Sequence, residues 1–180
     1  MFPSLPERGP REEGGPLHAP RERQGTGRHD NPDHYGAIYL SGDPEAAIAE
    51  RIQGFRGQSL TDDDLRRQDG SRYALVPLDE ARLGALVDLD DPAELVRRGI
   101  QPSRVAIRNR AVTQPIALSL YREGLPGFYW WSMLEASWTN ATLFAERAIP
   151  KLRIAGQPET LSVDHSALRV AADLLGVHLA

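Results

Sequence analysis

The sequence has 180 residues, of which 41% are apolar and 26% charged, with a formal net charge of −4. This length and composition fit one soluble globular domain. The acidic balance gives no reason to expect direct nucleic-acid binding. The absence of cysteine excludes disulfides and thiolate chemistry. No apolar run reaches the roughly 18 residues of a membrane span, and no secretory leader is recognised, so we expect a cytoplasmic protein without membrane contact.

The first part of the chain is rich in proline and glycine. Residues 1–27 contain five prolines, five glycines and charges that cancel. Such a segment has too little apolar surface to offset the entropy lost on ordering. We therefore expect residues 1–24 to form a disordered tail and residues 25–180 to form the folded domain.

A strand followed at once by a helix is the first element expected. Residues 37–40 form an apolar strand that ends at Ser-Gly-Asp-Pro. Asp43 is suited to cap a helix, and Pro44 to occupy its first position. This helix is expected to end near Phe55, with Ile48 and Ile52 on its apolar stripe.

Similar local signals predict the remaining elements. Further helices are expected, each with a cap, a proline or a closing glycine, within residues 60–70, 90–99, 115–122 and 165–175. Strands are expected within residues 72–78, 84–89, 127–132, 141–145, 151–156 and 159–164. This mixture of helices and many short strands predicts an α+β fold.

Several familiar sites are excluded by their local context. The glycines of residues 25–27 precede no strand–helix unit and do not predict a phosphate loop. His29 and His34, near Asp30 and Asp33, fit a polar loop better than a metal site, so no metal is expected. Ser132 lies in no nucleophile elbow.

Four polar residues allow both a structural and a functional interpretation when the sequence is considered without any family resemblance. Glu50 lies on the side of its helix away from the apolar stripe, as a surface charge does, but its small neighbours leave room for a ligand. The other three have equally plain structural interpretations: a core aromatic for Tyr39, a turn residue for Ser132 and a loop charge for Arg28.

A family resemblance joins these residues. The stretches "GRHDNPDHYGAIYLSGDPEAAIAE", "VPLD", "LVDLDD" and "GFYWWSMLEASWTNATLFAE" resemble, in this order, the RES-domain family. Its members are toxins of bacterial toxin–antitoxin pairs, named for an arginine, a glutamate and a serine. The resemblance covers roughly residues 25–150. Residues matching the family's arginine, tyrosine, glutamate, serine and asparagine are Arg28, Tyr39, Glu50, Ser132 and Asn140.

The resemblance implies a mixed, split β-sheet with flanking helices, similar to ADP-ribosyltransferases. It also implies cleavage of the nicotinamide–ribose bond of NAD, as substrate rather than cofactor, by water or by phosphate. Glu50 would stabilise the ribosyl cation and Arg28 would bind the diphosphate. Tyr39 would enclose nicotinamide, Ser132 would orient Glu50 or the ribose, and Asn140 would contribute to NAD binding. The tight turn after the strand would fix Glu50 relative to Tyr39.

The implied partner is an Xre-type antitoxin with a DNA-binding helix-turn-helix domain, and a homodimer is left open. Two alternatives share the fold: an ADP-ribosyltransferase that modifies a macromolecule, and a non-catalytic binding protein. The sequence departs from the family in two places. His29–Asp30 replace a stretch that is often aromatic, and "PLHAPRERQGT" replaces the strand that many members place before the arginine.

Overall fold

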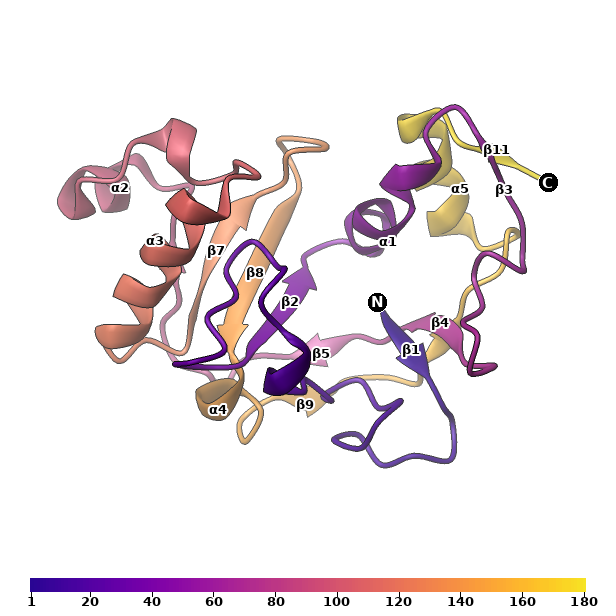
Figure 1. Cartoon of the computed structure of the whole chain (residues 1–180), viewed down its shortest axis with the longest axis horizontal. Coiled ribbons are helices and arrows are strands. Elements are labelled where there is room, and N and C mark those ends of the chain that lie inside the picture. The colour runs from indigo at the N-terminus through magenta and orange to yellow at the C-terminus, as the bar shows by residue number, and fades with distance from the viewer. The chain divides into compact units, whose positions relative to one another are not determined.

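The structure is a computed structural model that describes residues 1–180. The chain forms two compact units, each described here by itself (Figure 1). The terminal unit, which contains both chain ends, comprises Met1–His18, Gly42–Leu78 and Ile154–Ala180. The sheet unit comprises Ala19–Ser41 and Asp79–Arg153. No helix in either unit has the length and apolar character needed to cross a membrane.

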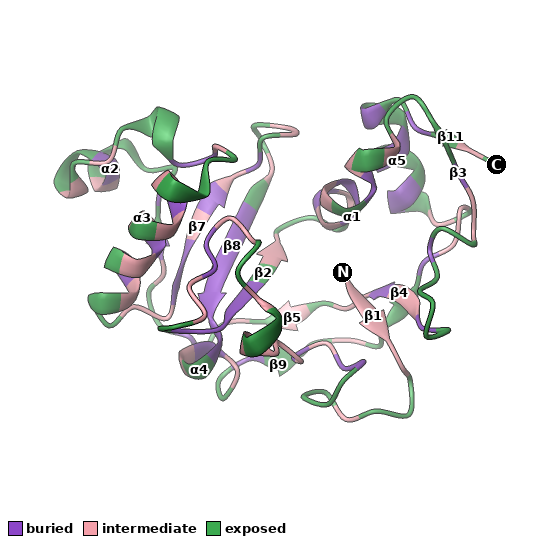
Figure 2. Ribbon diagram, viewed as in Figure 1, coloured by how far each residue is buried: buried purple, intermediate pink, exposed green.

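A four-stranded mixed sheet forms the centre of the sheet unit. Its strands lie in the order β2–β8–β7–β6, with bounds Ala37–Ser41, Thr139–Phe144, Gly127–Trp131 and Val87–Asp88. β8 pairs antiparallel with both β2 and β7, whereas β6 pairs parallel with β7. β8 is buried along nearly its whole length, as expected of a strand with neighbours on both sides (Figure 2). The expected α+β fold with a mixed sheet and flanking helices is confirmed.

Helices and aromatic side chains cover one face of this sheet. Helix α3 (Arg110–Arg122) packs against β7, and the core there includes Tyr35, Phe128, Trp130 and Phe144. Because successive side chains in a strand point to opposite faces, Phe128 and Trp130 of β7 share this face with Phe144 of β8. The remaining helical elements of the unit are η1 (Arg21–Arg23), α2 (Pro92–Arg98), η3 (Pro102–Arg104) and α4 (Ala145–Ala148).

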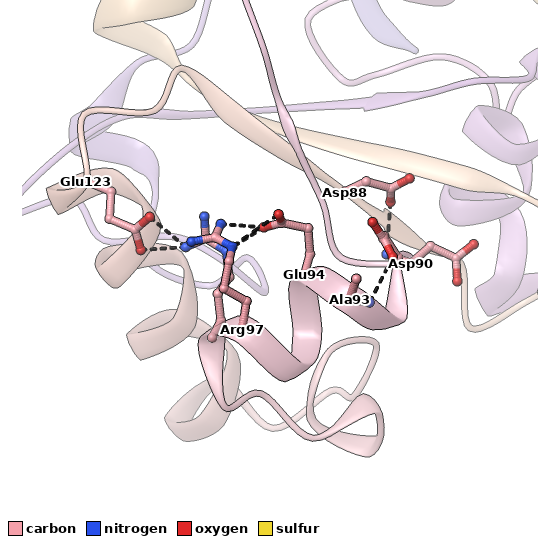
Figure 3. A network of polar contacts seen from close by, with 8 residues as sticks. Asp88, Asp90, Ala93, Glu94, Arg97 and Glu123 are labelled. Carbon is pink, nitrogen blue, oxygen red and sulfur yellow. Dashed lines mark hydrogen bonds and ion pairs between the residues drawn. The ribbon is translucent and has the colours of Figure 1, made fainter.

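Helix α2 is joined to the end of α3 by a cluster of charged side chains (Figure 3). Asp91 caps α2 by accepting a hydrogen bond from the Ala93 N–H at 2.8 Å, and its neighbour Asp90 is seen beside this turn in Figure 3. Arg98 Nη1 donates to Glu123 Oε1 at 2.5 Å. Its Nε also donates to Glu94 Oε2 at 3.1 Å.

The outer edge of the sheet at β2 is occupied by a side chain. The Gln24 amide Nε2 donates to the Ala37 carbonyl at 3.0 Å, and its Oε1 accepts from the Ala37 N–H at 2.7 Å. These are the two bonds that a neighbouring strand would make. Next to them, the Gly36 N–H donates to Glu146 Oε1 at 2.9 Å. One glutamine thus occupies the position of a further strand beside Ala37.

The terminal unit is built on two helices that pack together, α1 (Pro44–Ile52) and α5 (Ser166–Leu175). Ala46 and Ala49 of α1 and Ala171 and Ala172 of α5 are fully buried, and such small side chains let helices approach closely. Helix α1 continues into η2 (Gln53–Phe55), so the expected helix over this stretch is confirmed. The strands of the unit are β1 (Phe2–Ser4), β3 (Ser59–Leu60), β4 (Arg72–Leu75), β10 (Glu159–Thr160) and β11 (His178–Leu179).

Two small sheets complete this unit. β4 lies between β1 and β10 in an antiparallel sheet, and β11 pairs parallel with β3. The short strands β5 (Leu78–Asp79) and β9 (Arg153–Ile154) lie where the chain passes between the units.

The first residues of the chain differ from the disordered tail that the sequence predicts. β1 pairs with β4, with Phe2 opposite Ala74 and Ser4 opposite Arg72, and Leu17 is only 5% exposed. The physical reason is that backbone hydrogen bonds to an existing strand order a segment that has little apolar surface of its own.

Two helix predictions also need correction. The expected helix within residues 60–70 is a series of turns, in which the Asp64 carboxylate accepts from both the N–H and the hydroxyl of Thr61 at 2.8 Å. Side chains of this type compete with helix formation by binding nearby backbone groups. Helix α3 starts at Arg110, capped by Asn109, so Pro115 lies inside it and not at its first position.

Candidate functional site

One face of the four-stranded sheet carries most of the side chains that the resemblance identifies. The register pairs Tyr39 of β2 with Thr142 of β8, and Asn140 of β8 with Trp130 of β7. These four side chains point to the same face because they alternate with residues that face the opposite side. Ser132, two residues beyond Trp130, continues the series. The sheet therefore brings Tyr39, Asn140 and Ser132 onto one surface.

The loop of residues 25–30, called the arginine loop below, is folded around the carboxylate of Asp30. Asp30 is 5% exposed, and its Oδ2 accepts from the N–H groups of Gly25 at 2.8 Å and Gly27 at 2.7 Å. Its Oδ1 accepts from the Tyr39 hydroxyl at 2.7 Å. A Cβ on Gly27 would lie 2.5 Å from Asp30 Oδ1 and 2.6 Å from the Tyr39 hydroxyl oxygen, so only glycine fits there.

The carbonyl groups of the arginine loop are held by helix α3. The Thr113 hydroxyl donates to the Arg28 carbonyl at 2.5 Å. The side-chain amide of Gln114 donates to the Gly27 carbonyl at 3.2 Å. Helix and sheet thus fix the backbone on both sides of Arg28.

The Arg28 side chain extends over the aromatic part of the sheet face. Its Nη1 donates to the Ile107 carbonyl at 2.5 Å and lies 3.3 Å from the Met133 sulfur. Its Cζ lies 4.7 Å from the centre of the Trp130 ring, within the range of a cation–π interaction. The guanidinium is therefore held in a defined place above the sheet.

His29 lies beneath the arginine loop and is 2% exposed. Its Nδ1 is 2.8 Å from the Thr142 hydroxyl oxygen. Its ring packs edge-on against Phe128 and Trp130, with distances between ring centres of 4.9 and 5.1 Å. Burial and, secondarily, the positive charge of Arg28 lower the pKa of His29 to about 3. The imidazole is therefore neutral at physiological pH and serves as part of the core under the loop.

The ring of Tyr39 is partly exposed, whereas its hydroxyl is enclosed by the arginine loop. The residue is 40% exposed, yet its hydroxyl accepts from the His29 N–H at 2.9 Å and donates to Asp30. Enclosure of the hydroxyl, followed by its bond to the Asp30 carboxylate, raises the pKa of Tyr39 above its ordinary value. The surface that Tyr39 offers to a ligand is a flat, immobilised ring.

Asn140 and Ser132 are both buried at the end of the sheet. Asn140 is 3% exposed, and its Oδ1 accepts from the Ser41 hydroxyl at 2.8 Å, whereas its Nδ2 is buried without an acceptor. The Ser132 hydroxyl oxygen accepts from the Leu134 N–H at 3.1 Å, and the Ser132 N–H donates to the Trp138 carbonyl at 2.8 Å. The amide of Asn140 is thus a buried donor that still needs an acceptor.

Glu50 belongs to the terminal unit, on helix α1. It is half-buried, and the Gln53 side-chain amide donates to its Oε2 at 3.1 Å and to its carbonyl at 2.9 Å. Ala46, one turn earlier on the same side of the helix, is fully buried. The side of α1 that carries Glu50 is therefore not the open solvent face that hydrophobic periodicity indicates.

Sequence reasoning missed the residues that hold Arg28 in place. The sequence predicts a polar loop at Asp30, and no local signal indicates that Thr142 or Trp130 contacts this loop. A usable signal was present: two glycines at residues 25 and 27 supply N–H groups suited to an anion, which here is the internal Asp30 carboxylate. The structure shows no group of three or more His, Cys, Asp or Glu side chains placed to hold a metal.

The comparisons with known proteins agree with this arrangement of motifs. The model of the RES domain matches residues 6–164, so the chain belongs to the RES-domain family. The match begins within the segment that we expected to be a tail. No curated protein matches the sequence significantly.

One solved structure supports the fold. It is a chain in the crystal structure of the MbcT–MbcA toxin–antitoxin complex of M. tuberculosis. The similarity has a TM-score of 0.59 with 20% sequence identity, and it covers 82% of this chain and 75% of that chain.

Proposed function

We propose that this protein is the NAD-degrading toxin of a bacterial toxin–antitoxin pair and cleaves the nicotinamide–ribose bond of NAD. The observation that carries the proposal is the sheet face of a RES-domain protein on which a fixed guanidinium, an exposed ring and a buried amide donor gather. These belong to Arg28, Tyr39 and Asn140.

The three groups suit the parts of a dinucleotide. A guanidinium presents a rigid fork of donors that matches phosphate oxygens, which assigns the NAD diphosphate to Arg28. A fixed aromatic ring favours stacking, which assigns nicotinamide to Tyr39. Asn140 lies on the same sheet face with its Nδ2 donor buried and without an acceptor within the protein, and the family resemblance assigns this residue to NAD binding.

The chemical step calls for a carboxylate. Departure of neutral nicotinamide leaves an oxocarbenium-like ribose, which a fixed negative charge stabilises more strongly than it stabilises NAD itself. The family resemblance assigns this charge to Glu50 and the orientation of Glu50 or the ribose to Ser132. Water or phosphate would then attack the ribosyl carbon, giving hydrolysis or phosphorolysis.

A toxin of this kind requires a silencing partner. The M. tuberculosis structure of similar fold is described as a toxin–antitoxin complex. We accordingly propose a cognate antitoxin of the Xre type, whose DNA-binding domain leaves the toxin itself without direct nucleic-acid contact.

The activity is tested by incubating the purified chain with NAD, with and without phosphate, and separating the products. We expect release of nicotinamide together with ADP-ribose or its 1″-phosphate. Absence of nicotinamide from both reactions would refute the enzymatic proposal. Incorporation of label from NAD into added protein, in place of free ADP-ribose, would instead identify a macromolecular ADP-ribosyltransferase.

The role of Glu50 is tested by Glu50→Gln, which keeps the size of the side chain and removes its charge. Turnover should fall by about a hundredfold or more, the scale of losing one preorganised transition-state contact. NAD binding and thermal stability should change little. Glu45→Gln, on the first turn of the same helix, is the matched control and should retain activity. A fully active Glu50→Gln protein would remove this carboxylate from the mechanism.

A further inference from the structure

Asp30 is a buried carboxylate whose hydrogen-bonding partners all lie in the candidate site. Its three donors are the N–H groups of Gly25 and Gly27 and the hydroxyl of Tyr39, at 2.7 to 2.8 Å. A buried carboxylate is retained only when donors of this kind satisfy it. Here they connect the two ends of the arginine loop to strand β2.

The contacts of Asp30 constrain the backbone around Arg28. Gly27, the residue before it, is held by its N–H on Asp30, and the N–H of His29, the residue after it, is held by the Tyr39 hydroxyl. The Arg28 carbonyl is held by Thr113. With its backbone fixed on both sides, Arg28 loses little further freedom when its guanidinium meets an anion.

The same carboxylate determines what Tyr39 can do. The Tyr39 hydroxyl donates its proton to Asp30 and accepts from the His29 N–H, so it is already engaged at the inner side of the loop. The exposed part of Tyr39 is its ring, and the bond from its hydroxyl to Asp30 restricts the movement of that ring.

We infer that Asp30 is the positioning residue of this site, which sets the Arg28 guanidinium and the Tyr39 ring together without touching the substrate. This inference rests on the proposed cleavage of NAD for its catalytic meaning. Its structural content, that Asp30 holds Arg28 over Trp130, stands independently and has its own measurement.

The measurement independent of NAD is the NMR spectrum of Arg28. In the wild type, the Trp130 ring current should displace the Arg28 side-chain proton signals, since the guanidinium lies over that ring. Asp30→Ala should return these signals towards those of a flexible arginine. Asp30→Asn is isosteric and keeps an oxygen for the glycine N–H groups, so it should fold and give an intermediate displacement.

Asp91→Ala is the matched control, because the Asp91 carboxylate also accepts a hydrogen bond from a backbone N–H in this unit but caps helix α2. It should leave the Arg28 signals in place. Unchanged Arg28 signals in both Asp30 variants would overturn the inference, as would an equal change in Asp91→Ala. Neither result depends on whether the protein cleaves NAD.

The catalytic measurement is a double-mutant cycle between Asp30 and Arg28. Asp30→Asn should raise KM for NAD about tenfold and change kcat little, because loss of diphosphate binding affects substrate and transition state alike. NAD affinity is then compared in Arg28→Ala and in Arg28→Ala combined with Asp30→Asn. The second substitution should have a smaller effect there than in the wild-type background, because only the part of its action that passes through Tyr39 remains.

Full additivity of the two substitutions, in a wild-type protein that binds NAD, would overturn the inference. Failure of the wild type to bind or cleave NAD would refute the proposed function, and the NMR comparison would then decide the inference alone.

Discussion

His29 is a neutral histidine enclosed between the arginine loop and the aromatic side chains of the sheet. Its pKa is lowered to about 3 in the folded protein, whereas an unfolded chain would protonate it near pH 6.5. Between these values the unfolded state binds one more proton than the folded state. Stability should therefore fall as the pH is lowered through this window, by up to about 1.4 kcal/mol per pH unit.

This expectation is checked by urea unfolding of the wild type and His29→Gln at pH 7, 6 and 5. The fall in unfolding free energy between pH 6 and 5 should be smaller in the variant by about 1 kcal/mol. His34→Gln, on an exposed residue of the same segment, is the control and should fall as steeply as the wild type. Equal slopes in His29→Gln and the wild type would show that His29 is not buried in its neutral form.

Among the elements, α2 and α3 depend on one another through Arg98. The Arg98 side chain is 8% exposed and contacts both Glu94 and Glu123, whereas the Arg97 side chain is 59% exposed and contacts Glu94 only. Removing a desolvated charge with two partners costs more than removing an exposed one. Since α3 also holds the arginine loop, this contact supports the site at a distance.

We expect Arg98→Ala to lower the unfolding free energy by about 1–2 kcal/mol and Arg97→Ala to lower it much less, because the Arg97 pair is exposed to solvent. Urea unfolding of the two variants beside the wild type measures the difference. Equal losses would mean that the Arg98 cluster has no more value than an ordinary surface ion pair.

How far the elements follow from sequence depends on whether their signals are local. The sequence predicts the turn before α1, the cap and proline of α2, and the strands on either side of residues 133–138, because each signal lies within or next to its element. The signal of these strands is their content of aromatic and β-branched residues. Pro115 was expected to begin a helix, as prolines often do, whereas α3 begins at Arg110 and contains Pro115. The helix expected within residues 60–70 does not form, because the Asp64 side chain accepts a hydrogen bond from the Thr61 N–H and holds the segment as a turn.

For the candidate site too, some residues could be predicted from sequence and others could not. Arg28, Tyr39, Ser132 and Asn140 were identified through a family resemblance, and the structure places them in one unit. Their supports could not be predicted, because contacts such as that of His29 with Thr142 join residues far apart in the chain. Hydrophobic periodicity contains no information about such pairs.

At the scale of the whole molecule, the RES domain is assembled from a chain that passes between two units. The crossings lie at residues 18–19, 41–42, 78–79 and 153–154, and the family match from 6 to 164 includes parts of both units. The residues that the family is named for are divided accordingly: Glu50 belongs to the terminal unit and Arg28 and Ser132 to the sheet unit. Both units are therefore parts of the domain, and neither is an accessory.

The first residues belong to this assembly, since β1 forms one edge of the β1–β4–β10 sheet. Deletion of residues 1–5 should remove these hydrogen bonds and lower the melting temperature by about 2–4 °C for each kcal/mol lost. Replacing the exposed Glu7 and Arg8 by serine is the control and should leave the melting temperature unchanged. An unchanged melting temperature after the deletion would restore the interpretation of a disordered tail.

The glutamine beside Ala37 has a consequence for the behaviour of the protein at high concentration. A bare sheet edge is a template on which other chains add strands and aggregate. Gln24 uses the N–H and carbonyl of Ala37 itself, so at this position a second chain finds no free ladder group. Gln24→Ala should therefore produce assemblies detectable by light scattering in concentrated solution, with the isolated molecules still folded. A single amide side chain would thus help to keep the protein monodisperse.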